Sequence, residues 1–150
     1  MYRHILIPTD GSELAEHAVT NGLSLAKSVG AKVTVIIVKD PFNWLSVPET
    51  RASQRQALEN LARHKEQVEI HGVGVLKRAA DAAKQAGVPC DTLQVENAQP
   101  YQAIIAAASD RGCDLIVMAS HGRGGLSAVV LGSVTNKVLT HTKTPVLVYR

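Results

Sequence analysis

The sequence predicts an α/β fold, with an open parallel sheet of five strands and helices on both of its faces. Short continuous apolar runs, typical of strands covered on both faces, alternate with segments whose apolar residues recur at helical spacing. Such alternation is typical of a parallel sheet with right-handed crossover helices. The 150 residues show no internal repeat, low-complexity stretch or linker, so we expect a single domain over residues 1–150.

The N-terminal part of the chain predicts the first strand and the first helix. Residues 5–7 are an apolar run that Pro8 ends, which predicts a short buried strand. Asp10 is a good N-cap and Glu13 completes a capping-box pattern, so the helix is expected to begin at Asp10. Gly30 is expected to end this helix. The apolar stripe of the helix has 3.6-residue spacing and comprises Ala15, Ala18, Val19, Leu23 and Ala26.

A second buried strand is predicted over residues 33–38, which are rich in β-branched side chains. We interpret residues 39–50, which contain two prolines, the only Phe and the only Trp, as a loop or lid. A helix is expected over roughly residues 51–86. Its apolar side is made of Leu58, Leu61, Val68, Val75, Leu76, Ala79, Ala80 and Ala83. Gly72 and Gly74 each cost about 1 kcal/mol relative to Ala inside a helix, so this helix is either continuous or broken near Gly72.

The rest of the chain predicts three strands and two helices. Residues 90–95 alternate between polar and apolar, which suits a strand at the edge of the sheet. Pro100 suits the first turn of a helix that ends near Gly112. Residues 114–118 are the fourth strand, and residues 145–149 are the fifth.

The apolar character of the strands also predicts their order. Numbered along the chain, the strands are expected in the order 3-2-1-4-5, because the most apolar ones, the first, second and fourth, then lie inside the sheet. This order places the topological switch point between the first and fourth strands, where ligands of open α/β sheets bind. The loops at Thr9-Asp10 and Ala119-Ser120 are therefore expected to meet there.

A glycine-rich loop joins the fourth strand to the last helix. Residues 118–122 follow the strand, and Gly132 precedes residues 134–139, whose apolar side chains recur at helical spacing. Backbone N–H groups at a helix start can hold a phosphate, and glycine allows a phosphate oxygen to approach closely. We therefore expect the amides of residues 132–134 to suit anionic oxygens.

Composition argues against several classes of partner and compartment. The net charge is +3, but the basic residues form no run and aromatic residues are scarce, so a nucleic-acid partner is not indicated. No apolar stretch is long enough to span a bilayer, and the N-terminus lacks the apolar region of a signal peptide. Cys90 and Cys113 lie beside strand-like runs and are read as reduced, structural thiols. We expect a cytoplasmic protein with no membrane partner.

Several motifs together resemble a known family. They are Ile-Leu-Ile-Pro-Thr-Asp-Gly-Ser at 5–12, Asp-Leu-Ile-Val-Met at 114–118, Ser-His-Gly-Arg-Gly-Gly-Leu at 120–126, Leu-Gly-Ser-Val at 131–134 and Pro-Val-Leu-Val at 145–148. Over its whole length the chain resembles the universal stress proteins of the UspA type. The resemblance implies a Rossmann-like fold of the kind also found in adenine nucleotide alpha hydrolases.

The nucleotide-binding branch of this family carries Gly, two residues, Gly, nine residues, Gly and then Ser or Thr. On this chain Gly122, Gly132 and Ser133 match the motif, whereas Ala119 replaces the first glycine and adds a methyl group near the expected path of the ribose or phosphates. Asp10 can accept hydrogen bonds from ribose hydroxyls, and the backbone of Val38 would hold the adenine. The full set of nucleotide contacts that the resemblance implies is Pro8, Thr9, Asp10, Val38, Met118, Ala119, His121, Gly122, Arg123, Gly132, Ser133 and Val134.

The resemblance implies an ATP- or AMP-binding protein of the stress response that acts as a nucleotide-dependent switch. Hydrolysis is expected to be slow or absent, because the chain lacks a Gly-x-x-x-x-Gly-Lys-Ser/Thr loop and any nameable arginine finger. Mg²⁺ or Mn²⁺ would sit on the ATP phosphates, since the histidines show no metal-ligand spacing. No catalytic residue is predicted: His121 has no marked partner, and Ser12 and Ser133 lack a nucleophile elbow.

Other functions stay open at this point. Part of the family lacks the glycine motif and works through dimerisation and protein partners, and Ala119 keeps such a nucleotide-free interaction module as the alternative. A homodimer through residues 145–149 is expected, because an apolar edge strand invites pairing with another chain. An adenylating enzyme is disfavoured, because Pro8 to Ser12 replace the Ser-Gly-Gly-x-Asp-Ser loop of such enzymes.

Overall fold

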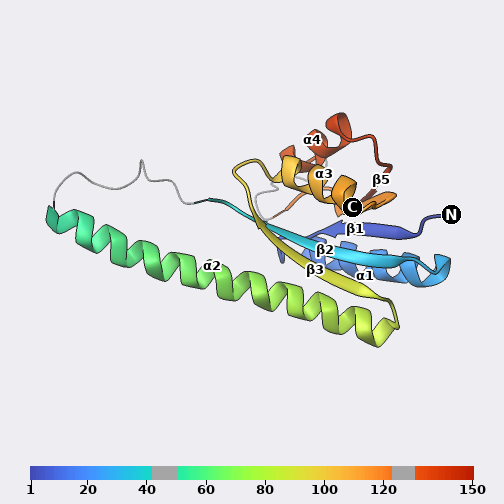
Figure 1. The fold of residues 1–150 in the computed structure, drawn as a ribbon, viewed down its shortest axis with the longest axis horizontal. Coiled ribbons are helices and arrows are strands. Elements are labelled where there is room, and N and C mark those ends of the chain that lie inside the picture. Colours follow the sequence, from blue (N-terminus) through green and yellow to red (C-terminus); the bar gives the residue numbers. More distant parts are fainter. Residues whose placement is uncertain (42–50, 123–130) are drawn as a thin grey trace.

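The computed structural model describes residues 1–41, 51–122 and 131–150, with the side chains of residues 51–53 left out. Its five strands are all parallel and lie in the order β3-β2-β1-β4-β5, which confirms the predicted fold class and strand order (Figure 1). The strands are β1 (His4–Pro8), β2 (Lys32–Lys39), β3 (Cys90–Glu96), β4 (Leu115–Ala119) and β5 (Val146–Tyr149).

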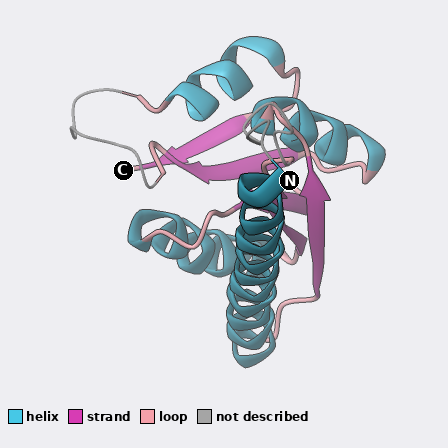
Figure 2. Cartoon of the chain, turned by 90° about the vertical axis from the view of Figure 1, so that its left-hand side faces the viewer, coloured by secondary structure: helices cyan, strands magenta, loops and turns pink. Residues whose placement is uncertain are grey.

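Helices cover both faces of the sheet, as Figure 2 shows. They are α1 (Glu13–Val29), α2 (Arg51–Ala86), α3 (Pro100–Asp110) and α4 (Ser133–His141). Because successive strand residues point to opposite faces, Ile5 and Ile7 pack with α1 and α2, whereas Leu6 packs with α3 and α4. All three side chains are fully buried, so β1 is a central strand with a core on each side.

The start of α1 differs from the prediction. Its N-cap is Ser12, whose hydroxyl accepts a hydrogen bond from the Ala15 N–H at 3.3 Å, and not Asp10. Gly11 has a φ of +76°, so a tight turn separates Asp10 from the helix. Asp10 instead shapes this turn, since its Oδ1 accepts the Ser12 N–H at 2.9 Å. The predicted capping box with Glu13 does not form, because Glu13 is the first helical residue.

Helix α2 is a single helix of 36 residues, so the alternative of a break near Gly72 is wrong. Gly72 is buried against β3, and a β-carbon there would lie 3.3 Å from Gln94 Oε1, which explains a glycine at this position. On the apolar side Val75, Leu76, Ala79 and Ala83 are buried and Ala80 is half-buried, but Leu58 is 46% exposed. The N-terminal half of α2 extends beyond the sheet (Figure 1).

The structure also places the predicted edge strands of the sheet and the two cysteines. β3 and β5 are the edge strands, and the Leu147 side chain on β5 is half exposed. Both cysteines are free, and burial raises the pKa of the Cys113 thiol to about 11, which keeps it protonated at neutral pH.

Most of the predicted loop over 39–50 lies outside the described residues. None of the helices in the described ranges has the length and apolar content that a bilayer crossing requires.

Candidate functional site

A cavity of about 240 Å³ opens at the carboxyl edge of the sheet, at the switch point between β1 and β4. Of the predicted contacts, the structure brings nine to its lining: Pro8, Thr9, Asp10, Val38, Met118, Ala119, His121, Gly122 and Val134. Gly132 and Ser133 begin α4 directly beside Val134, and Arg123 lies outside the described residues. The lining also includes residues that were not predicted, namely Ala15, Ile36, Pro100, Ile104 and Thr135.

The Asp10 carboxylate joins the two loops that meet at the switch point. One of its oxygens accepts the Ser12 N–H at 2.9 Å, which fixes the carboxylate on the turn after β1. The other oxygen, Oδ2, lies against Gly122 in the loop after β4, so closely that a β-carbon on Gly122 would collide with it. Gly122 therefore lacks a side chain because the Asp10 carboxylate occupies that space.

Ser120 holds the end of β4 in place. It is buried, its N–H donates to the Tyr149 carbonyl at 2.7 Å, and its own carbonyl accepts the Gly132 N–H at 2.7 Å. Its hydroxyl is hydrogen-bonded to His121 Nδ1 at 3.0 Å. These bonds fix the His121 backbone and ring relative to β5 and the start of α4.

The start of α4 is tied to β4 by a second hydrogen bond. The Thr135 hydroxyl, which is buried, donates to the Ala119 carbonyl at 2.9 Å. Gly132 fits there because it has no side chain: a β-carbon would lie 3.0 Å from His121 Cα and 3.1 Å from the Ser120 carbonyl oxygen. The last helix therefore begins directly above the carboxyl end of β4.

These bonds correct one expectation. The Gly132 N–H, predicted as a donor to anionic oxygens, is already used by the Ser120 carbonyl. The first helical bond runs from the Asn136 N–H to the Gly132 carbonyl at 2.9 Å, so the amides of Ser133, Val134 and Thr135 are the first-turn donors of α4. The first-turn donors of α4 therefore begin at Ser133, one residue later than the predicted range of 132–134.

The methyl group of Ala119 has a packing role. Ala119 is 8% exposed and clusters with Ala15 and Ala18 of α1, on the opposite face of the sheet from Met118. Ala119, which stands where the nucleotide-binding motif has its first glycine, therefore extends the core toward α1 by one methyl group.

The other end of the cavity is apolar. Ile36, Ile104 and Met118 are almost completely buried and belong to one hydrophobic cluster, and the partly buried Val38 and Pro100 also line the cavity. Such an apolar wall suits a flat, weakly polar ring system.

Over the described residues, no group of three His, Cys, Asp or Glu side chains is arranged to hold a metal ion.

Comparisons with known proteins agree with one another. The sequence model of the universal stress protein family matches residues 1–150. A universal stress protein of Methanocaldococcus jannaschii is 31% identical over 150 residues, which cover 100% of this chain and 83% of that protein. One from Thermus aquaticus is 31% identical over 151 residues, and the match covers 100% of both chains.

Two solved structures show the same fold. The structure of the protein MJ0577 of Methanocaldococcus jannaschii has a TM-score of 0.80 and 27% identity, and covers 99% of this chain and 96% of its own. A universal stress protein solved in complex with cAMP has a TM-score of 0.72 and 25% identity, and covers 99% of this chain and 97% of its own.

Proposed function

This chain belongs to the universal stress protein family, and we propose that it binds an adenine nucleotide, ATP or AMP, in the cavity between β1 and β4. The observation that carries this proposal is that one cavity is lined both by the Asp10 turn and by the first turn of α4. An acidic hydrogen-bond acceptor and the first turn of a helix thus line the same space. The relative solved with cAMP supports the ligand class.

The nucleoside would occupy the enclosed part of the cavity. The apolar wall of Ile36, Ile104 and Met118 would cover the adenine, with the Val38 backbone at its edge, and Asp10 would accept hydrogen bonds from the ribose hydroxyls. The cavity of about 240 Å³ is smaller than sites that enclose a whole ligand, which hold roughly 300–1,000 Å³. The phosphates would therefore extend through its opening.

The phosphates would lie at the start of α4. The amides of Ser133 and Val134 would donate to phosphate oxygens, the Ser133 hydroxyl is exposed beside them, and Arg123 would add charge. An Mg²⁺ or Mn²⁺ ion would be held by the phosphates, water and at most the Ser133 hydroxyl, because Mg²⁺ keeps most of its water shell in such sites.

We assign the site a regulatory role in the stress response, with slow or no hydrolysis of ATP. None of the described residues that line the cavity is a lysine or an arginine. The sequence also lacks the Gly-x-x-x-x-Gly-Lys-Ser/Thr loop of P-loop hydrolases, which supports nucleotide binding without efficient phosphoryl transfer. The bound nucleotide would change the conformation or the protein partner of a homodimer paired through β5.

Isothermal titration calorimetry with AMP and with ATP tests this function. The wild-type protein should bind both, and Asp10→Asn should bind about 10- to 100-fold more weakly, because it loses a charged acceptor while its oxygen still caps the Ser12 amide. Wild-type protein that is dimeric but shows no affinity for either nucleotide would reject the proposal in favour of a nucleotide-free interaction module.

A further inference from the structure

One face of α2 touches the turn that carries Asp10. A β-carbon on Gly11 would lie 2.6 Å from Val75 Cγ2 and 3.1 Å from His71 Nε2, so both side chains of α2 press against the turn between β1 and α1. Gly11 also needs its positive φ of +76°, which few other residues adopt. The position of the Asp10 backbone is therefore set in part by α2.

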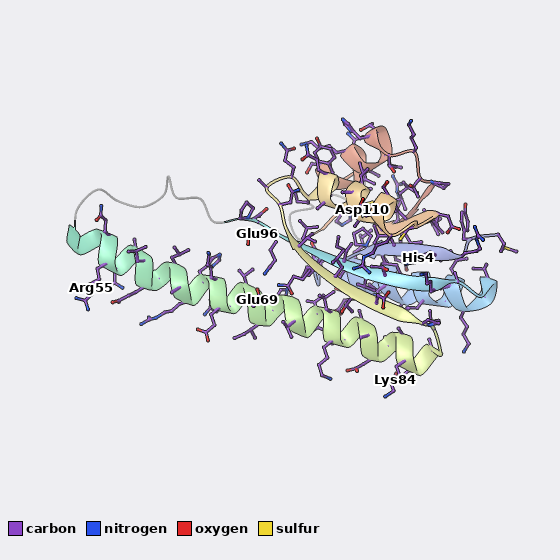
Figure 3. The ribbon with its side chains drawn as sticks, in the orientation of Figure 1. His4, Arg55, Glu69, Lys84, Glu96 and Asp110 are labelled. Atoms are coloured by element: carbon purple, nitrogen blue, oxygen red, sulfur yellow. The ribbon has the colours of Figure 1, made fainter. Side chains whose placement is uncertain are left out.

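The same helix is tied to the end of β2. Lys39, which follows Val38, forms an ion pair with Glu69 of α2, and its side chain is only 19% exposed. The hydrogen bond from Lys39 lowers the pKa of the Glu69 carboxyl, which is charged at neutral pH. The other Glu69 oxygen accepts Gln94 Nε2 of β3 at 3.1 Å. Glu69 thus joins the ends of two strands, and Figure 3 shows it where α2 passes them.

A second cavity is lined by residues of both attachments, Lys39 and His71. It has a volume of about 390 Å³ and lies between α2 and the end of β2, with His64, Val68 and His71 on the helix side. Asp10 and Val38 line this cavity as well as the candidate nucleotide site. This cavity leaves room for α2 to move relative to the strand ends, which a close-packed contact would resist.

Beyond these attachments α2 continues away from the sheet. At 1.5 Å per residue the 36-residue helix is about 54 Å long. Its projecting half is largely exposed, with Leu58 46% accessible, and Arg55 lies far from the strands (Figure 3). A small movement at Glu69 and His71 is therefore enlarged at the far end of the helix.

We propose that α2 regulates the nucleotide site, with Glu69 and His71 as positioning residues. Glu69 links the helix to the end of β2, which carries Val38, and His71 links it to the turn after β1, which carries Asp10. The inference rests on the proposed function and adds its mode of control. Binding of a nucleotide at Asp10 and Val38 restrains both strand ends and, through them, the helix. By thermodynamic linkage, a partner that binds α2 more tightly in the presence of nucleotide raises the affinity for nucleotide by the same factor.

Hydrogen exchange of the full-length protein tests this coupling. Saturating ATP should slow the exchange of amides in residues 54–71 by about fivefold or more, the low end of typical coupling factors. Glu69→Gln should abolish most of this slowing and weaken ATP binding about fivefold. Exchanging the two charges, Glu69→Lys with Lys39→Glu, should restore part of both effects.

A matched control lies on the same helix. Asp81 forms an ion pair with Lys77 at 2.9 Å, and its carboxylate is 56% exposed against 55% for Glu69. Because this pair joins residues of α2 alone, Asp81→Asn should change neither the ATP affinity nor the response of residues 54–71. Urea midpoints of the two variants should agree, which separates lost coupling from lost stability.

The outcomes separate the two proposals. ATP that binds to the wild type without slowing exchange in residues 54–71 would overturn the regulation by α2 and leave the nucleotide site in place. Equal effects of Glu69→Gln and Asp81→Asn would also overturn it. Absence of ATP binding to the wild type would overturn both the proposed function and this inference.

Discussion

Gly122 and Asp10 lie in direct contact across the switch point, with the Asp10 carboxylate in the space that a side chain on Gly122 would need. The two loops that carry them belong to β1 and β4, which are more than a hundred residues apart in the chain and adjacent in the sheet. The absence of a side chain at Gly122 thus leaves room for the Asp10 carboxylate. This contact makes the candidate site sensitive to one added methyl group.

Gly122→Ala is predicted to displace the Asp10 carboxylate. Without well-placed charged hydrogen bonds to the ribose, AMP affinity should fall about 10- to 100-fold. Calorimetry measures the affinity, and Gly74→Ala is the control, because its β-carbon would meet only the end of Arg78 at 3.9 Å. The control should bind AMP normally and gain up to about 1 kcal/mol of stability. Unchanged affinity in Gly122→Ala would contradict the role given to Asp10.

Thr135→Val is predicted to loosen the start of α4. The substitution removes the buried bond to the Ala119 carbonyl and should lower the free energy of unfolding by about 1 to 3 kcal/mol. Binding of ATP should weaken more than binding of adenosine, because the displaced amides are the proposed phosphate donors. Thr140→Val is the matched control: its exposed hydroxyl bonds the Asn136 carbonyl at 3.0 Å within α4. Equal losses for ATP and adenosine would argue against phosphate binding at this helix.

Leu147→Glu is predicted to convert a dimer into a monomer. Leu147 is 49% exposed on the edge strand β5, and a charge at such an edge blocks pairing with another chain. Light scattering at micromolar concentration gives the mass. Leu58→Glu, at a side chain that is 46% exposed on α2, should leave the dimer intact. A wild-type protein of monomeric mass would reject pairing through β5.

Stability is predicted to fall as the pH drops below about 6.5, because of His4. Burial, and then the charge of Lys32, lower the pKa of the His4 imidazole below its ordinary 6.5 in the folded protein. The unfolded chain keeps the ordinary pKa and binds more protons over this interval, so acid favours unfolding. The neutral ring donates from Nδ1 to the Arg111 carbonyl at 3.0 Å and accepts the Thr34 hydroxyl at Nε2 at 2.9 Å.

Urea unfolding between pH 5 and 8 measures this dependence. His4→Gln should flatten the curve, although it lowers stability overall, because the buried imidazole that resists protonation is gone. Parallel curves for the wild type and His4→Gln would show that another group sets the pH dependence.

Much of the fold could be predicted because its strands are encoded locally. The runs at 5–7 and 115–118 are apolar on both faces, as is the run at 33–38 apart from Thr34, and this places all three strands inside the sheet. The start of α1 could not be predicted, since Asp10 and Ser12 are both good caps. The positive φ of Gly11 decides between them, and α2 contributes to that turn by packing against it.

The rest depends on tertiary contacts that no local pattern contains. The apolar stripe of α2 looks alike in both halves, yet the sheet lies beneath only one of them, so Val75 is buried and Leu58 is not. The glycine spacing indicates where α4 begins, but only the fold shows that Ser120 uses the Gly132 amide. Thr135 was missed because its hydroxyl bonds a residue of another element.

A crystal structure of the protein grown with ATP tests the central claim most directly. The account predicts electron density for the adenine beside Val38, the ribose within hydrogen-bond distance of Asp10, and phosphate oxygens on the Ser133 and Val134 amides. A nucleotide bound elsewhere, or an empty cavity between β1 and β4 at saturating ATP, would contradict it.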